Sequence, residues 1–195
     1  MTGVMRAVLE RTACVTAAAM VVLAGVGPDG ARGQSAEPWD DALASTLTGS
    51  WALVGSRDTA QATIEVSIAA AVLGLPPLID TFAASELRAR LIVSPTLVLS
   101  VTSSRIEARF LQATYDSAPG APARYLVPDG TSETMEVVQL LRDGRLEQIF
   151  TTDGGRRWNT FTPSPDGERL AHEVVLRARR LSRDVRYAVT YHRIR

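Results

Sequence analysis

Residues 133–163 read ETMEVVQLLRDGRLEQIFTTDGGRRWNTFTP. Three runs of alternating apolar and polar residues are separated here by two turn pairs, Asp143-Gly144 and Gly154-Gly155. Such pairs between alternating runs are strong hairpin signals, because glycine adopts the positive φ angles that tight turns need. The stretch therefore predicts three consecutive antiparallel strands.

The same pattern extends in both directions from this stretch. Asp129-Gly130 and Asp166-Gly167 are two further turn pairs, and residues 47–56 predict a first strand. The candidate strands after it cover residues 96–101, 105–112, 123–128, 133–142, 145–152, 156–163, 169–178 and 184–193. A meander of eight or nine strands exposes two edges unless it closes. The sequence therefore predicts a mainly β protein, an antiparallel up-and-down β-barrel.

A helical interval interrupts the strands at residues 58–91. Its first half, with Asp58 as the expected N-cap, repeats apolar residues at helical spacing, at positions 60, 64, 68, 71, 72 and 75. Its second half begins at Pro76 and Pro77 and predicts another apolar stripe of Leu78, Ile79, Phe82, Leu87 and Leu91. We expect a two-helix insert directly after the first strand, hinged at Gly74 and gating the barrel.

The first 33 residues have the pattern of a secretory signal peptide. Arg6 and Arg11 precede an uncharged run, residues 12–27, and Ala31 and Gly33 occupy the −3 and −1 positions of a cleavage site. An uncleaved anchor is the alternative interpretation. We expect residues 1–33 to be removed, 34–46 to form a leader with one helical turn, and 47–195 to form one barrel domain in an exported protein, periplasmic or secreted.

Composition argues against several classes of function. The chain has no lysine, and its 21 arginines balance 21 acidic residues. One arginine cluster, Arg177, Arg179, Arg180, Arg183 and Arg186, suits a solvated hairpin end better than the broad basic face that nucleic acids need. Cys14 is the only cysteine and lies in the signal region. We find no catalytic, phosphate-binding, cofactor or metal motif, and expect no stable membrane insertion after cleavage. The oligomeric state stays open.

Gly49-Ser50-Trp51 on the first strand and Arg193 on the last resemble the signature of the lipocalin and fatty-acid-binding-protein superfamily, the calycins. The helix insert and the closing YHRIR are similar to the fatty-acid-binding branch, although Tyr191-x-Arg193 reverses the Arg-x-Tyr order of that branch. The resemblance implies a barrel, with a helical lid, that holds a small apolar or amphipathic, lipid-like ligand. It also implies that the tryptophan and the late basic residue meet at one barrel end.

The last strand carries most of the candidate site residues. Val185, Tyr187, Val189 and Tyr191 share one face, which we expect to point inward, so that the tyrosines fill the interior or offer hydroxyls to a ligand. Arg193 has two interpretations. It either packs on Trp51 and closes the barrel, or binds the anionic head group of a ligand.

His172 and His192 are the only histidines, and we expect them at similar heights on paired strands. With Glu173 they could form a metal site, but the absence of a third clear ligand favours ordinary core or surface histidines. His172 shares the parity of apolar neighbours and is a candidate for lining the cavity. Two alternatives to a binding protein remain at this point. One is an isomerase or hydrolase of a lipid-like substrate with His172 as base, and the other is a packed barrel acting as a structural or interaction module.

Overall fold

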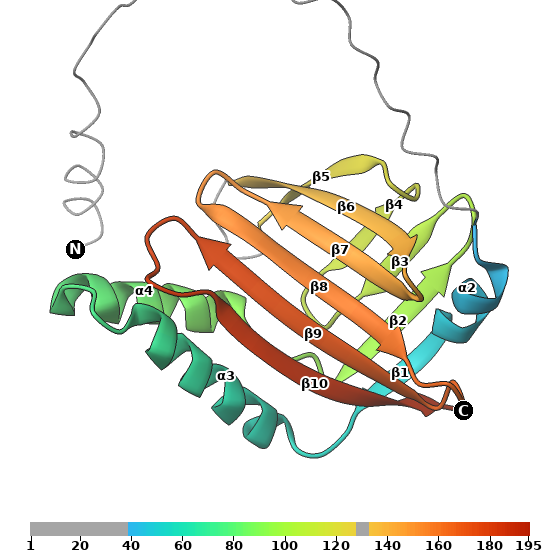
Figure 1. Ribbon diagram of the computed structural model, residues 1–195, viewed down its shortest axis with the longest axis horizontal. Helices are drawn as coiled ribbons and strands as arrows, with labels where there is room; N and C mark the ends of the chain where they lie inside the picture. The colour runs from blue at the N-terminus through green and yellow to red at the C-terminus, as the bar shows by residue number, and fades with distance from the viewer. Residues whose placement is uncertain (1–38, 128–132) are drawn as a thin grey trace, which may run out of the picture. The chain divides into compact units, whose positions relative to one another are not determined.

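The computed structural model describes residues 39–127 and 133–195 (Figure 1). Its three helices are α2 (Asp41–Leu47), α3 (Arg57–Val72) and α4 (Pro77–Arg90). Its strands are β1 (Gly49–Leu53), β2 (Thr96–Val101), β3 (Ile106–Arg109), β4 (Thr114–Ser117), β5 (Pro122–Leu126), β6 (Thr134–Arg142), β7 (Arg145–Thr151), β8 (Gly155–Pro163), β9 (Arg169–Ala178) and β10 (Val185–Ile194). No helix in these ranges is long and apolar enough to cross a membrane.

The ten strands form one antiparallel sheet in the order β4-β3-β2-β1-β10-β9-β8-β7-β6-β5. Strands that follow one another in sequence pair throughout, except β4 and β5, and β10 pairs in addition with β1. The last strand thus hydrogen-bonds to the first, with Trp51 opposite Arg193. This order confirms the predicted up-and-down barrel with a two-helix insert after the first strand.

The barrel is nearly closed, because β4 and β5 end the strand order without forming a ladder. Side chains bridge this gap instead. The Tyr125 hydroxyl donates to the carbonyl of Asp116 and accepts from its amide at 2.6 Å. The Gln139 amide donates to the Ile106 carbonyl at 2.9 Å and to the Ser117 hydroxyl at 3.2 Å. These bonds satisfy backbone groups that an open edge would leave exposed.

Strand β4 was absent from the sequence prediction, which extended one strand from residue 105 to 112. The chain instead turns sharply after β3, and the amide of Phe110 donates to the carbonyl of Ala113 at 2.8 Å. None of residues 110–113 is Gly, Pro, Asn or Asp, so the usual turn signal is missing. At the predicted Asp143-Gly144 turn, both residues have positive φ, 52° and 72°, as a type I′ hairpin requires. The predicted Asp129-Gly130 turn lies outside the described residues.

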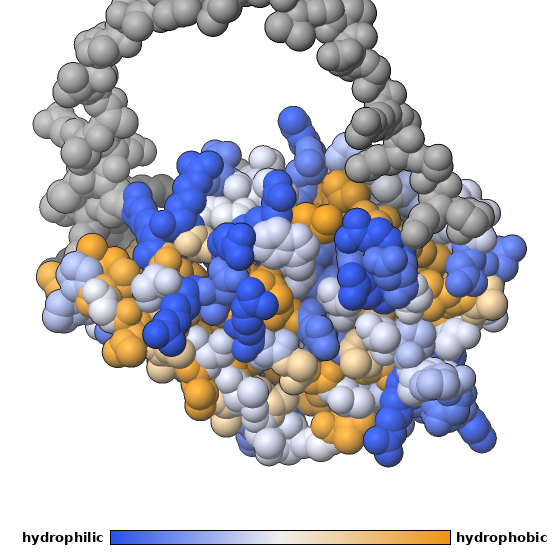
Figure 2. All heavy atoms as spheres, in the orientation of Figure 1, coloured by the Kyte–Doolittle hydropathy of each residue, from blue (hydrophilic) through white to orange (hydrophobic). Residues whose placement is uncertain are grey.

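The helices differ from the prediction in their details. Ser56, not Asp58, is the N-cap of α3, and its hydroxyl accepts from the amide of Thr59 at 3.1 Å. The predicted stripe of α3 is buried at Ile64, Ile68, Ala71 and Val72. In α4, however, the first half of the predicted stripe points outward, with Leu78, Ile79 and Phe82 exposed. Figure 2 shows this hydrophobic surface at the left, where α4 begins.

Helix α3 lies along β10 and is anchored to the barrel (Figure 1). The Ser67 hydroxyl accepts from the Arg186 amide at 2.8 Å, and the Ser182 hydroxyl donates to the carbonyls of Ala71 and Leu73. Helix α4 contacts α3 through an ion pair between Arg88 and Glu65. Of the two helices predicted to gate the barrel, α3 is therefore fixed to the wall.

The barrel end beside α2 is closed. Leu43, Ala44 and Leu47 of α2 are buried against the barrel, and its seven residues form two turns where the leader was expected to form one. The indole of Trp51 is fully buried and donates to the Leu47 carbonyl at 3.1 Å. Helix α2 therefore closes the end of the barrel that lies opposite α3 and α4 (Figure 1).

Candidate functional site

Two connected spaces lie at the open end of the barrel. The inner cavity, about 70 Å³, lies within the barrel. The outer cleft, about 300 Å³, lies between α4 and the turns that join β7 to β8 and β9 to β10. They share the lining residues Arg90, Gln112, Tyr115 and Arg157, so the cleft adjoins the cavity. The cleft reaches the lower limit of ordinary ligand pockets.

The outer cleft is predominantly apolar. Helix α4 contributes Ile79, Phe82 and Leu87, while Met135 and Phe150 belong to a small hydrophobic cluster on the facing barrel wall. The exposed side chains of Ile79 and Phe82 thus border the cleft and do not bury into the core. An apolar chain of a ligand would find its environment here.

A layer of polar side chains crosses the barrel interior. Gln139 lies opposite Gln148, and Gln148 lies opposite Asn159, so the three amides occupy one height on β6, β7 and β8. Gln148 donates to Gln139 at 2.5 Å, and Asn159 donates to Gln148 at 3.2 Å. All three side chains are buried. Asn159, at one end of the layer, lines the inner cavity.

Arg157 lies on β8 between the cavity and the cleft. Its guanidinium is 4.0 Å from the centre of the Phe150 ring, and its buried Nε has no hydrogen-bond partner among the described residues. Arg90, the other cation of the cavity lining, forms ion pairs with Glu86 and Glu133. No carboxylate of residues 39–127 or 133–195 pairs in this way with Arg157. A partly buried, uncompensated cation is costly unless an anion joins it.

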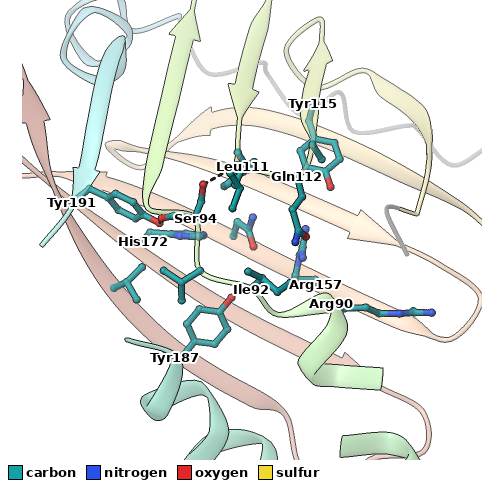
Figure 3. Close-up of a pocket in the computed structure, with 15 residues that line it drawn as sticks. Arg90, Ile92, Ser94, Leu111, Gln112, Tyr115, Arg157, His172, Tyr187 and Tyr191 are labelled. Atoms are coloured by element: carbon teal, nitrogen blue, oxygen red, sulfur yellow. Dashed lines mark hydrogen bonds between the residues drawn. The ribbon is translucent and has the colours of Figure 1, made fainter. Parts of the chain in front are cut away.

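His172 lies on β9 and lines the inner cavity (Figure 3). Its ring stacks on Phe161 with centroids 4.4 Å apart, and it is 6% exposed. Burial, with a smaller effect from the charge of Arg157, lowers the pKa of His172 to about 3. The ring is therefore neutral near pH 7, with one nitrogen donating and the other accepting. Neither nitrogen has a partner among the described residues.

Tyr187 and Tyr191 line the same cavity from β10, as Figure 3 shows. The Tyr191 hydroxyl donates to the Ser94 carbonyl at 2.9 Å. The Tyr187 hydroxyl forms no hydrogen bond with the described part of the chain. Burial raises the pKa of both phenols, and for Tyr187 the charge of Arg157 partly offsets this rise. Both groups are therefore neutral donors at physiological pH.

Arg193 lies at the closed end and lines neither the cavity nor the cleft. Its Nε donates to the Gly167 carbonyl and its Nη1 to the Thr48 carbonyl, both at 2.9 Å, and its Nη2 donates to the Thr46 carbonyl. Its guanidinium carbon is 4.3 Å from the centre of the Trp51 ring. The geometry therefore suits the closure interpretation. Its contribution to stability stays a prediction.

Gly49 explains the glycine of the Gly-x-Trp pattern. A Cβ atom at this position would lie 2.6 Å from Nη1 of Arg193, and the glycine has a φ of 148°. Only a residue without a side chain leaves room for the guanidinium to reach the Thr48 carbonyl.

The expectation that His172 and His192 lie at similar heights is wrong. His172 pairs with Val189 and His192 with Arg169, so the two histidines are three positions apart and face opposite sides of the sheet. The hairpin turn is longer than expected. Its length was not predictable from the sequence, because no glycine marks its centre. In the described ranges, no group of three or more His, Cys, Asp or Glu residues could hold a metal ion.

Sequence reasoning missed Arg157 and the three buried amides. Each has the parity of apolar neighbours on its own strand. Gln139 and Gln148 are equally distant from the 143–144 turn, and Gln148 and Asn159 are equally distant from the 153–154 position. The sequence signal for these residues was that polar side chains interrupt the apolar face of neighbouring strands at matching heights.

No protein-family model matches this chain, and no curated protein matches it in sequence. Solved structures do match it. Echinococcus granulosus fatty-acid-binding protein 1 is 12% identical with a TM-score of 0.47, and the match covers 77% of this chain and 99% of that one. A Schistosoma mansoni fatty acid binding protein in complex with arachidonic acid is 11% identical with a TM-score of 0.45, over 78% and 98%. Human cRBP IV is 14% identical with a TM-score of 0.43, over 80% and 100%.

The fold is a nearly closed antiparallel up-and-down β-barrel. The strand order and the gap between β4 and β5 carry this assignment. At identities this low, the likeness to the solved structures concerns the fold alone.

Proposed function

We propose that this protein binds a small amphipathic, lipid-like molecule inside its barrel, with an anionic head group on Arg157 and an apolar chain under α4. The observation that carries the proposal is the uncompensated guanidinium of Arg157 between a polar cavity and an apolar cleft. A carboxylate there would supply the missing counter-charge and accept from the guanidinium. The chain would then lie against Phe82, Leu87 and Met135.

The same geometry favours a binding protein over an enzyme. A general base works best with a pKa near the operating pH, and burial lowers the pKa of His172 to about 3. Its ring stacks on Phe161 and contacts no carboxylate of the described chain that could raise its basicity. His172 is therefore a weak base, suited to hydrogen bonding.

The test compares dodecanoate with dodecanol, measured by displacement of a fluorescent fatty-acid probe. We expect dodecanoate to bind with a Kd of about micromolar. Arg157→Met should weaken dodecanoate binding about 10- to 100-fold and leave dodecanol binding nearly unchanged, because only the anion uses the charge.

Arg169→Met is the matched control. Arg169 is exposed on β9 and lines neither the inner cavity nor the outer cleft. This variant should bind both probes as the wild type does. Absence of saturable dodecanoate binding to the wild type would contradict the proposed function, and equal losses in both arginine variants would remove Arg157 from it.

We also propose that the protein is exported, on the support of the signal-peptide pattern of residues 1–33. Expression of the full chain in a Gram-negative host should yield a periplasmic or secreted product whose mass corresponds to a chain starting at Gln34. Recovery of an intact Met1 would contradict export by cleavage.

A further inference from the structure

The polar layer ends in an acceptor that has no partner. The Oδ1 atom of Asn159 is buried without a hydrogen bond to any described residue, and the Asn159 side chain is 3% exposed. The side chain lines the inner cavity. A buried acceptor without a partner is destabilising, so this position calls for a donor from a molecule inside the cavity.

The orientation of the Asn159 amide is fixed by the layer. The Ile106 carbonyl can only accept, so Gln139 must direct its NH₂ group toward it and its oxygen toward Gln148. Gln148 then presents its NH₂ group to Gln139 and its oxygen to Asn159. Asn159 must in turn donate to Gln148, which leaves its oxygen toward the cavity. A flip of any one amide would oppose two donors or two acceptors.

His172 supplies a second unpartnered group beside Asn159. Phe161 pairs with His172 and Asn159 pairs with Val174, so His172 and Asn159 are diagonal neighbours on adjacent strands, about 7–8 Å apart. Both side chains are more than nine-tenths buried and line the same cavity. The site therefore offers one acceptor from Asn159 and one donor and one acceptor from His172.

Only some chemical groups satisfy such a site. A hydrocarbon leaves all these atoms unpaired, and a carboxylate offers acceptors alone and would oppose the Asn159 oxygen. A hydroxyl both donates and accepts. We infer that the ligand carries a hydroxyl group that donates to Asn159 Oδ1 and accepts from the ring N–H of His172.

The position of this hydroxyl follows from the strand. Arg157 and Asn159 are two residues apart on the same face of β8, which places their backbones about 6.6 Å apart. A ligand with its anionic group on Arg157 would therefore present the hydroxyl near its head. The far end of its chain would lie in the apolar cleft. The ligand class is a hydroxylated carboxylic acid with the hydroxyl close to the carboxylate, an inference that rests on the proposed function.

The test compares β-hydroxydodecanoate, dodecanoate and ω-hydroxydodecanoate on the full protein by probe displacement. We expect β-hydroxydodecanoate to bind about tenfold more tightly than dodecanoate, the worth of a well-placed hydrogen bond. The ω-hydroxy acid should bind more weakly than dodecanoate, because its hydroxyl would enter the apolar cleft. Equal binding of the β-hydroxy acid and dodecanoate overturns the inference and means that solvent satisfies Asn159 and His172.

Variants locate the effect. Asn159→Leu should abolish the preference for the β-hydroxy acid, and His172→Phe, which can keep the stack on Phe161, should reduce it. The second variant keeps the inference testable if the loss of the Asn159 donor to Gln148 prevents folding. Thr160→Val, on the outer face of the same strand, should retain the full preference.

A retained preference in His172→Phe overturns the assignment of the hydroxyl to this pair. The failures of the two proposals are distinguishable. If dodecanoate itself does not bind the wild type, the proposed function fails, whereas equal binding of both acids contradicts only the hydroxyl.

Discussion

Arg193 and Arg157 have the same inward parity on their strands but lie at opposite ends of the barrel. At the closed end, all three guanidinium nitrogens of Arg193 donate to backbone carbonyls, and its face packs on Trp51. At the open end, Arg157 packs on Phe150, and its Nε has no partner in the described chain. The fold thus provides a carbonyl for every guanidinium nitrogen of Arg193, whereas Nε of Arg157 has none among the described residues.

The difference separates structural roles from binding roles. A cation whose donors are all used by the protein has nothing left for a ligand, and its removal leaves carbonyls without donors. A cation with unused donors destabilises the empty protein and is compensated only when an anion binds. Mutations at the closed end should therefore change the free energy of unfolding, whereas mutations at the open end should change the affinity for the ligand.

The largest expected effect is at the closed end. Arg193→Met should lower the free energy of unfolding of the ligand-free protein by about 3 kcal/mol, because charged hydrogen bonds to carbonyls are lost. Trp51→Leu should also be destabilising. The double variant should lose less than the sum, with a coupling of about 0.5–3 kcal/mol, since the two side chains are in contact. Denaturant unfolding of the four proteins gives the cycle.

Arg157→Met is the matched comparison for that cycle. Replacing a partly buried charge by an apolar side chain of similar length should change the ligand-free stability by less than about 1 kcal/mol. If Arg193→Met unfolds at the wild-type midpoint and the cycle is additive, Arg193 does not close the barrel. A large destabilisation by Arg157→Met would show that the open end is structural as well.

The next prediction concerns the pH dependence of stability that His172 causes at the open end of the barrel. In the unfolded chain His172 takes up a proton near pH 6.5, whereas in the folded protein its pKa is about 3. The unfolded state therefore binds more protons within this window, and stability falls as the pH falls through it. Above pH 6.5 the imidazole is neutral in both states and contributes no pH dependence.

Unfolding at pH 7, 5.5 and 4 should show this difference against His172→Phe. Near the middle of the window the wild type should lose about 1.4 kcal/mol per pH unit more than the variant does. Arg193→Met, which is remote from the cavity, should keep the wild-type slope. Parallel curves for the wild type and His172→Phe would mean that the buried ring accepts a proton without cost.

The fold was predictable because its signals are local. Alternation fixed the inward face of each long strand, and pairs such as Asp143-Gly144 fixed where the strands reverse. The elements that were predicted wrongly are those that lack such local signals. The turn between β3 and β4 has no turn residue, and the long turn between β9 and β10 has no central glycine, so one strand and one histidine register were missed.

The site was less predictable, because its chemistry depends on what is absent nearby. The sequence contains 21 arginines, and nothing local indicates that the donors of Arg193 are satisfied while Nε of Arg157 is not. That distinction arises only when strands far apart in the chain meet. A family resemblance led to the expectation that Arg193 lies beside Trp51, as it does, whereas no resemblance pointed to Arg157 or Asn159.

The smallest expected effect repeats the comparison within one strand. Tyr191 and Tyr187 are both on the inner face of β10, but only the Tyr191 hydroxyl has a partner, the Ser94 carbonyl. Tyr191→Phe should therefore lower the free energy of unfolding of the ligand-free protein by about 1 kcal/mol, the net worth of one hydrogen bond. Tyr187→Phe should leave this stability unchanged within error, because its hydroxyl bonds to nothing in the described chain.

The effects of the two substitutions on dodecanoate affinity should have the opposite order, since Tyr187 has a free donor beside Arg157 and Tyr191 has none to spare. Tyr187→Phe should then weaken binding several-fold while Tyr191→Phe does not. Equal effects of the two substitutions on affinity would mean that the satisfied and the unsatisfied hydroxyl are equivalent to the ligand, and that an unused donor does not mark the binding surface.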